Sequence, residues 1–162
     1  RPEDLAGGGA DPSVARSIIQ TNVVGVLDLT AALLPTLRQQ PHATIIATSS
    51  GLGFVPLAAY PTYCASKAFL HSWLQSLRFQ LRDTSVEVLE LAPPYVQTEL
   101  TGSGQAADPN AMPLADFIAE AMRLLEAPAQ PGGEILVERV KPLRWAERNG
   151  DFERIFAALN QG

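Results

Sequence analysis

Several residue types are scarce in this chain of 162 residues. It has one cysteine and two histidines, so no internal disulfide can form and no metal-ligand spacing is present. Twelve basic residues stand against 17 acidic ones, and the net charge of −5 gives no reason to bind nucleic acid or an anionic membrane. No apolar run reaches the roughly 20 residues of a membrane span, and residues 1–10 lack a signal-peptide core. We therefore expect a cytoplasmic protein without a metal site.

Hydrophobic residues make up 46% of the chain and follow two periods. The run at 43–48 is typical of a buried parallel strand, and the run at 86–91 has the length of a second one. Apolar residues recur at helical spacing over 13–39, where Ser13 is placed as the N-cap, and over 62–82.

Shorter elements follow toward the end of the chain. We expect a loop at 95–113, helices at 114–125 and 152–159, and a strand at 134–138. Helices that alternate with apolar strands predict an α/β protein with a parallel sheet. Three strands are about half of a Rossmann-like, doubly wound sheet, so residues 1–162 are expected to form a single, incomplete domain.

Tyr63 and Lys67 are the first candidates for chemistry. Four residues apart on a helix, their side chains lie on one face. A phenol has a pKa near 10, and a neighbouring ammonium lowers that pKa toward neutral pH, which makes the phenol useful as an acid or base. A chance pairing of a helix-start tyrosine with a surface lysine is the competing interpretation.

Two further polar residues occupy informative positions. Ser50 follows the first strand, and ligands of open α/β sheets bind at the carboxyl ends of strands, where this hydroxyl could hold a substrate oxygen. Asn22 lies inside an apolar helix and needs a hydrogen-bonding partner there. From these residues alone, Ser50 could equally cap a turn, and backbone or water could satisfy Asn22.

Four segments together resemble the short-chain dehydrogenase/reductase family over roughly residues 13–137. They are Asn22-Val23-Val24-Gly25, Ile45-Ile46-Ala47-Thr48-Ser49-Ser50, Tyr63-Cys64-Ala65-Ser66-Lys67 and Leu91-Ala92-Pro93-Pro94-Tyr95-Val96-Gln97-Thr98. Their order and spacing match the Asn-Ser-Tyr-Lys tetrad of that family. Pro94 departs from the family pattern, which has glycine at that position.

The resemblance implies a catalytic role for each tetrad residue. Tyr63 would be the general acid or base, and Ser50 would orient the substrate oxygen. Lys67 would lower the tyrosine pKa and bind the nicotinamide ribose, while Asn22 would hold a water that links Lys67 to solvent. The reaction implied is hydride transfer between NAD or NADP and a secondary alcohol or carbonyl compound.

The resemblance also implies binding surfaces. The cofactor would contact Tyr63 and Lys67 together with residues of the segment 93–98, namely Pro93, Pro94, Val96 and Thr98. Residues 95–125 would form a substrate loop and helix. The helices at 13–39 and 62–82 would pair with a second copy in a homodimer, although a missing part of the fold could cover the same apolar surface.

One feature of the family is missing from this sequence. The family begins with a glycine-rich turn that holds the pyrophosphate, and no glycine cluster here follows a strand in that way. We therefore expect a C-terminal catalytic portion that lacks the N-terminal cofactor-binding half. Two functions follow as alternatives: the catalytic part of an oxidoreductase, or an inactive truncated piece that serves as an assembly or interaction module.

Overall fold

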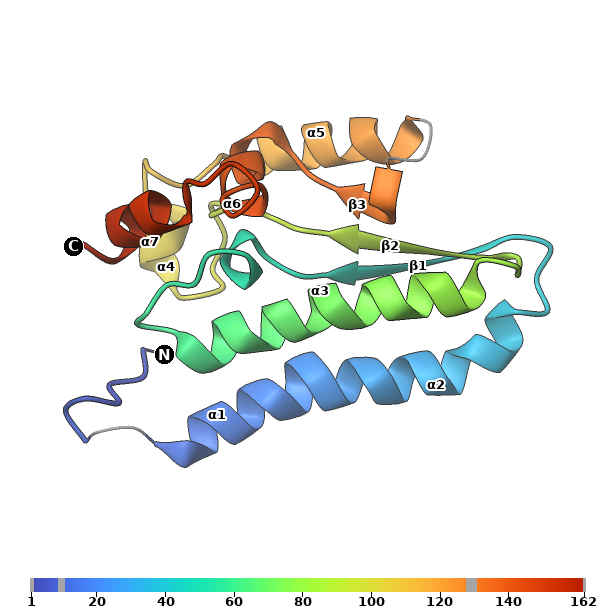
Figure 1. Cartoon of the computed structure of the whole chain (residues 1–162), viewed down its shortest axis with the longest axis horizontal. Helices are drawn as coiled ribbons and strands as arrows, with labels where there is room; N and C mark the ends of the chain where they lie inside the picture. Colours follow the sequence, from blue (N-terminus) through green and yellow to red (C-terminus); the bar gives the residue numbers. More distant parts are fainter. Residues whose placement is uncertain (1, 9–10, 128–130, 162) are drawn as a thin grey trace.

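Three parallel strands form a sheet in the order β1-β2-β3 (Figure 1). The computed structural model describes residues 2–8, 11–127 and 131–161. β1 (Ala43–Thr48) and β2 (Val86–Leu91) have the predicted bounds and pair along their whole length. β3 (Glu134–Ile135) is shorter than predicted, because the chain turns into the 3-10 helix η4 (Glu138–Val140). The predicted parallel α/β fold is thus confirmed.

A long helix runs beside the sheet and is built of three consecutive pieces. These are α1 (Pro12–Ile19), the π-helix η1 (Gln20–Val24) and α2 (Gly25–Leu37). The predicted cap at Ser13 is wrong, because the Asp11 side chain is the N-cap and accepts from the Ser13 backbone N–H at 2.9 Å. Asp11 is the stronger cap here because its carboxylate also accepts from the Ser13 hydroxyl at 2.7 Å.

The helix α3 (Pro61–Leu81) lies on one face of the sheet (Figure 1). The helix α5 (Leu114–Glu126) packs beside β3, at the opposite edge of the sheet from β1. A core forms where one row of α3 meets the strands. It comprises Leu74, Leu77 and Leu81 of the helix with Ala43, Val86 and Val88. A second cluster joins α5 to the segments that follow β2 and β3 and contains Val96, Met112, Ala121, Val137 and Val140.

Short helices occupy the remaining turns. They are the 3-10 helices η2 (Gly51–Gly53) and η3 (Pro131–Gly133), with α4 (Ser103–Ala106), α6 (Lys141–Arg144) and α7 (Phe152–Asn160). The predicted loop at 95–113 is therefore more ordered than expected. It contains α4 and a parallel bridge between Val96 and Met112.

β1 differs from the expectation of a buried strand. Only Ala43 is buried, and Ile46 is 46% exposed. The reason is positional, since β1 pairs with β2 alone among the described residues and is the edge of this sheet. Its apolar residues therefore need a further covering layer to become a core.

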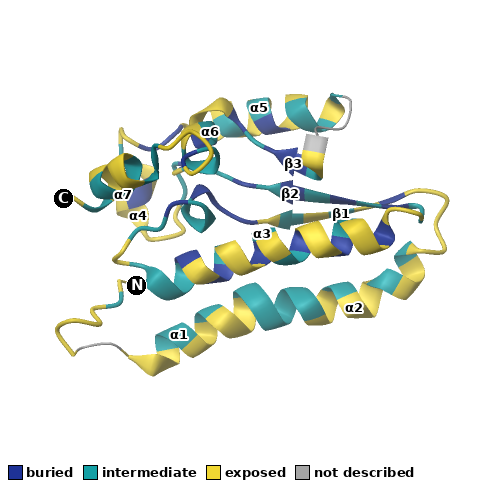
Figure 2. Cartoon of the chain, viewed as in Figure 1, coloured by how far each residue is buried: buried dark blue, intermediate teal, exposed yellow. Residues whose placement is uncertain are grey.

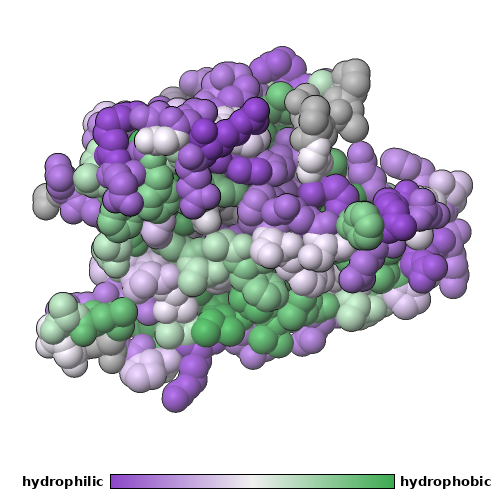
Figure 3. Space-filling model, viewed as in Figure 1, coloured by the Kyte–Doolittle hydropathy of each residue, from purple (hydrophilic) through white to green (hydrophobic). Residues whose placement is uncertain are grey.

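The helix Pro12–Leu37 also has an unusual surface. None of its residues is buried, and Leu29 and Leu33 are 61% and 48% exposed (Figure 2). Apolar side chains gather where it lies beside α3 (Figure 3). It has 26 residues, and an 18-residue window of it has a mean hydropathy of 1.5, which is long and apolar enough to cross a membrane and corrects the expectation that no segment would be. Core helices of soluble proteins pass the same test of length and composition.

Candidate active site

Ser50, Tyr63 and Lys67 come together where β1 ends and α3 begins. Lys67 donates from Nζ to the backbone oxygen of Thr48, the last residue of β1, at 2.8 Å. Its ammonium nitrogen lies 5.6 Å from the centre of the Tyr63 ring. The one-face geometry expected for a tyrosine and a lysine four residues apart is therefore present.

Ser50 starts the turn that follows β1. Its hydroxyl oxygen accepts from the Leu52 N–H at 3.2 Å and so caps η2, which is the capping role considered as an alternative. The same side chain lies beside the Tyr63 phenol and lowers its pKa. Ser50 is 8% exposed, so the capped turn holds its hydroxyl beside the phenol with little access to water. Capping and a chemical role are compatible, because the turn fixes the hydroxyl.

The phenol of Tyr63 does not have the lowered pKa expected from its lysine neighbour. Burial raises the pKa of Tyr63 above its ordinary value, and the hydrogen bond with Ser50 opposes this rise. The physical reason is that removing the phenolate from water outweighs the effect of an ammonium that lies 5.6 Å from the ring centre. In the chain by itself, the Tyr63 phenol is therefore protonated at neutral pH.

Burial acts on Lys67 in the opposite direction. It lowers the pKa of the ammonium, because the charged form loses hydration. The Thr48 carbonyl oxygen keeps one N–H bond for the ammonium at 2.8 Å. Burial thus favours the neutral form of both Tyr63 and Lys67.

Asn22 lies in the π-helix η1 and reaches α3. Its Nδ2 donates to the Ser66 hydroxyl at 3.0 Å, and that hydroxyl donates to the Tyr63 backbone oxygen at 2.7 Å. The partner of Asn22 is therefore a side chain, rather than the backbone or water considered from sequence. Single π turns in α-helices often occur at functional sites, and this one faces the helix that carries Tyr63.

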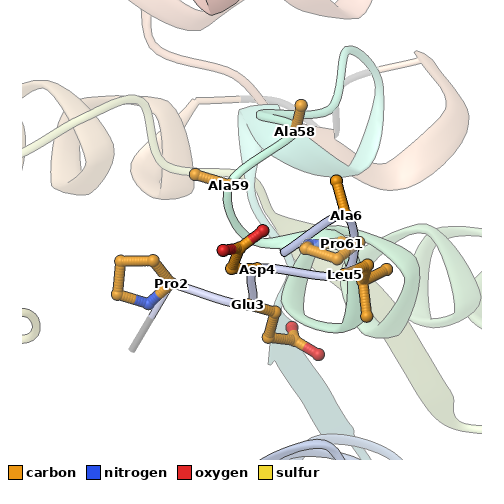
Figure 4. A pocket seen from close by; sticks show the side chains of 8 residues that line it. All are labelled: Pro2, Glu3, Asp4, Leu5, Ala6, Ala58, Ala59 and Pro61. Atoms are coloured by element: carbon orange, nitrogen blue, oxygen red, sulfur yellow. The ribbon is translucent and has the colours of Figure 1, made fainter. Parts of the chain in front are cut away.

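The first turn of α3 has a cap from far earlier in the chain. The Glu3 carboxylate accepts from the backbone N–H of Thr62 at 3.0 Å and from its hydroxyl at 2.6 Å. Residues 2–6 run beside the loop that leads into α3, around a cavity of about 450 Å³ (Figure 4). This contact holds the turn in which Tyr63 lies, and nothing in the sequence pattern pointed to Glu3.

A groove of about 470 Å³ lies between the long helix and β1. Its lining includes Asn22, Thr48 and Lys67 together with apolar residues of α2 and β1. Tyr63 and Ser50 line neither this groove nor the cavity beside residues 2–6. The groove therefore reaches the site from the side of Lys67.

The segment 93–98 lies next to the turn that carries Ser50. The Pro93 oxygen accepts from the Gly51 N–H at 2.9 Å, and Pro94 follows half-buried. Gln105 organises the rest, since its Nε2 donates to the Val96 oxygen at 2.7 Å and to the Thr98 hydroxyl oxygen at 3.1 Å. An amide nitrogen only donates, so the Thr98 hydroxyl keeps its own proton to give to a ligand. Sequence reasoning missed Gln105, which stands in an irregular stretch without a periodic signal.

A buried carboxylate lies behind the site. Glu90 is 0% exposed and accepts from the Ser49 hydroxyl at 2.5 Å, while its other oxygen is 2.8 Å from His71 Nδ1. Sequence reasoning missed it, although the two-residue period of β2 places Glu90 on the same buried face as Val86 and Val88. That two-residue period was the sequence signal from which the burial of Glu90 could have been predicted.

Beside this carboxylate is an ion pair between Arg144 and Glu134. The Arg144 guanidinium donates to both Glu134 oxygens, at 2.6 and 2.8 Å, and these bonds are the main reason that its pKa is raised. Ligand atoms of His71, Glu90 and Glu134 lie within 4.8 Å of one another, a spacing that could hold a metal ion. Protein donors already engage both carboxylates, so within the described residues this group is satisfied without a metal.

A parallel α/β sheet with hydroxyl, phenol and ammonium groups at its carboxyl edge belongs to the nucleotide-binding type of enzyme fold. The family model described as short chain dehydrogenase matches residues 9–109, and the chain belongs to this family. The resemblance inferred from the four sequence segments is thereby confirmed at the level of the family.

Two curated relatives show how much of the family's length is present. An uncharacterised oxidoreductase of Bacillus subtilis, DltE, is 42% identical over 144 residues, which cover 88% of this chain and 56% of the relative. A sulfoacetaldehyde reductase of Chromohalobacter salexigens is 41% identical over 102 residues, covering 60% of this chain and 40% of the relative. The chain thus spans about half the length of these relatives.

A solved structure has the same fold over nearly the whole chain. A short chain dehydrogenase from Burkholderia cenocepacia in complex with NADP superposes with a TM-score of 0.80 at 22% identity. The match covers 98% of this chain and 66% of that one. At this identity the comparison supports the fold alone.

Proposed function

We propose that the protein containing this chain is an NAD- or NADP-dependent oxidoreductase that interconverts a secondary alcohol and a carbonyl compound. The observation that carries the proposal is the arrangement of Ser50, Tyr63 and Lys67 at the end of β1. Membership of the short chain dehydrogenase family supports it, as do relatives named as an oxidoreductase and a reductase.

In the proposed reaction Tyr63 handles the proton. For reduction, the phenol gives its proton to the carbonyl oxygen as the carbon receives a hydride, and for oxidation the phenolate takes the alcohol proton as hydride leaves. Ser50 donates to the same substrate oxygen and holds it at the phenol. The nicotinamide, when bound, supplies or accepts the hydride, and its oxidised form carries a positive charge that favours the phenolate.

Lys67 and Asn22 are proposed to assist the proton transfer by Tyr63. The Lys67 ammonium, already fixed on Thr48, is placed to bind the nicotinamide ribose and to replace the proton lost by Tyr63. Asn22, through Ser66, ties the π turn to the backbone of Tyr63 and is proposed to hold a water in the relay to solvent.

Four residues after β2 are proposed to contact the cofactor, namely Pro93, Pro94, Val96 and Thr98. The free proton of the Thr98 hydroxyl fits an acceptor such as an amide or phosphate oxygen. NADP or NADPH is bound in several similar structures, including a serine dehydrogenase that matches with a TM-score of 0.65. Residues 95–125 are proposed to cover the substrate.

A homodimer is the proposed assembly. The apolar, unburied surface of the helix Pro12–Leu37 continues onto α3, where Phe69 is 37% exposed. Two copies that pack these helices would cover both surfaces. Sedimentation at micromolar concentration should give a dimer that Leu33→Glu converts to a monomer, and a wild-type monomer would contradict this assembly.

Within this proposal the protein acts in the cytoplasm rather than in a membrane.

Tyr63→Phe in the full-length protein tests the chemistry. Turnover should fall by a factor of about 10²–10⁴, because the general acid is gone. NADH and NADPH binding, followed by fluorescence, should stay within about twofold, since the phenyl ring keeps the packing. Retained turnover would refute the role of the phenol. Absence of cofactor binding to the unsubstituted protein would favour the inactive assembly module instead.

A further inference from the structure

Glu90 is an unusual residue for its place. It is 0% exposed and lies on the face of β2 that packs Val86 and Val88 against α3. A carboxylate at such a position destabilises the fold unless it is fully hydrogen-bonded, and an apolar side chain would continue the core without that cost. Its presence therefore calls for a role that an apolar residue could not fill.

The partners of Glu90 form a chain of side chains from β1 to α3. One oxygen accepts from the Ser49 hydroxyl at 2.5 Å, and the other lies 2.8 Å from His71 Nδ1. The amide nitrogen of Gln75 lies 2.9 Å from His71 Nε2. With the amide oriented this way, Nε2 accepts from Gln75 and Nδ1 donates its proton to Glu90. Both carboxylate oxygens of Glu90 then accept a hydrogen bond, and one of these bonds comes from His71 of α3.

Ser49, the residue that Glu90 holds, stands between two parts of the site. On one side the Thr48 oxygen accepts from Lys67 at 2.8 Å, and on the other the Ser50 side chain lies beside the Tyr63 phenol. The backbone N–H of Ser49 also donates to the Leu91 oxygen at 2.8 Å. Ser49 is thus fixed through both its backbone and its side chain, at the point where strand geometry gives way to the turn η2.

We propose that Glu90 is a positioning residue, which fixes the Ser50 hydroxyl against the Tyr63 phenol by holding the Ser49 side chain. This inference rests on the proposed function. The paired register of β1 ends at Thr48, and single backbone bonds from Ser49 to Leu91 and from Gly51 to Pro93 then flank Ser50. The Ser49–Glu90 contact is the side-chain anchor directly beside Ser50. A hydroxyl that must meet both a substrate oxygen and a phenol tolerates displacements well below 1 Å.

A double-mutant cycle on turnover tests the proposal in the full-length protein. Ser49→Ala and Glu90→Gln should each lower kcat by about 10- to 100-fold, with KM and cofactor affinity within about twofold. The double variant should lose no more than the worse single variant, because Ser49→Ala removes and Glu90→Gln weakens the same contact. Glu87→Gln, on the opposite, half-buried face of the same strand, is the matched control and should keep kcat.

The opposite pattern overturns the proposal. If Ser49→Ala and Glu90→Gln lower the melting temperature but leave kcat unchanged, Glu90 only stabilises the fold. Ser49→Ala removes only one oxygen atom. Its melting temperature and kcat can therefore still be compared with those of the unsubstituted protein if Glu90→Gln does not fold. An active unsubstituted enzyme with unaffected variants refutes the positioning role and leaves the proposed function intact.

A second readout does not need turnover. In protein labelled with ¹³C at tyrosine Cζ, the Tyr63 signal, assigned with Tyr63→Phe, reports the hydrogen bond that the phenol makes. Ser49→Ala and Glu90→Gln should shift this signal as Ser50→Ala does, while Glu87→Gln should not. An unmoved Tyr63 signal in the two variants refutes the inference, whether or not the protein turns over substrate.

Discussion

The two halves of α3 meet the sheet in contrasting ways. The half from Leu74 to Leu81 packs leucines on Ala43, Val86 and Val88, and this forms the larger part of the core. The half from Tyr63 to His71 instead places an ammonium and an imidazole against polar groups of β1 and β2. It also places the Ser66 hydroxyl against Asn22 of the long helix. One helix and two strands thus contribute both to the apolar core and to the polar groups of the candidate site.

This difference shows what each half contributes. Apolar contacts are not directional, so the second half supplies stability but tolerates small shifts. Hydrogen bonds between buried groups are directional and costly to leave unmade, so the first half fixes geometry with little net stabilisation. A register set by the apolar half is what brings Lys67 to Thr48 and His71 to Glu90.

The largest effect on stability is expected from the apolar half. Leu74 is 0% exposed, and Leu74→Ala should lower the free energy of unfolding by about 2–5 kcal/mol through lost burial and the cavity left behind. Urea unfolding followed by circular dichroism measures it. Leu100→Ala, at a side chain that is 73% exposed, is the control and should change little. Equal effects of the two variants would contradict the assigned core.

A smaller effect is expected where the polar half meets the long helix. Ser66→Ala removes the acceptor of Asn22 and should lower the free energy of unfolding by about 1–3 kcal/mol, because a half-buried amide loses its partner. Ser76→Ala, which removes an exposed bond to Ser72 on the same helix, is the matched control. If Asn22→Ala and Ser66→Ala add fully, the two side chains do not interact.

The smallest effect is a dependence on pH. Burial lowers the pKa of Lys67, so between that lowered pKa and its unfolded value of about 10.4 the unfolded chain holds more protons. Stability should therefore rise with pH in this window relative to Lys67→Met. Unfolding free energies of both proteins from pH 7 to just below 10 measure the difference, and Arg82→Met is the control for an exposed cation. A pH-independent difference would contradict the burial of the ammonium.

Measurements stop near pH 10 for a reason set by the neighbouring phenol. Burial raises the pKa of Tyr63, so above its ordinary value the unfolded chain releases this proton first. Stability then falls with further increase in pH, opposite to the effect of Lys67. The two groups therefore act in adjacent windows.

Strand positions were predictable from sequence, whereas their environment was not. The runs 43–48 and 86–91 are short, apolar and bounded by turn residues, and both strands have those bounds. The exposure of Ile46 depends on which strands flank β1, and a local pattern holds no information on that. The third strand was overestimated because Val137 is apolar and buried, although it follows the strand.

The candidate site divides in the same way. Tyr63, Lys67 and Ser50 could be found because their roles depend on spacing along one helix and on the end of one strand. Glu3 and Gln105 act through contacts that fold distant or irregular segments onto the site, and no periodicity marks them. The direction of the Tyr63 pKa shift also needed the structure, since burial outweighed the neighbouring charge.

The open side of β1 has a practical consequence for anyone who handles this chain by itself. Among the described residues β1 is paired along one side alone, and with Ile46 nearly half exposed its other side is a template onto which further strands can add. At high concentration such an edge favours self-association into larger particles rather than a defined assembly. Low concentration or a charged substitution such as Ile46→Lys should therefore extend the time that the chain remains in solution.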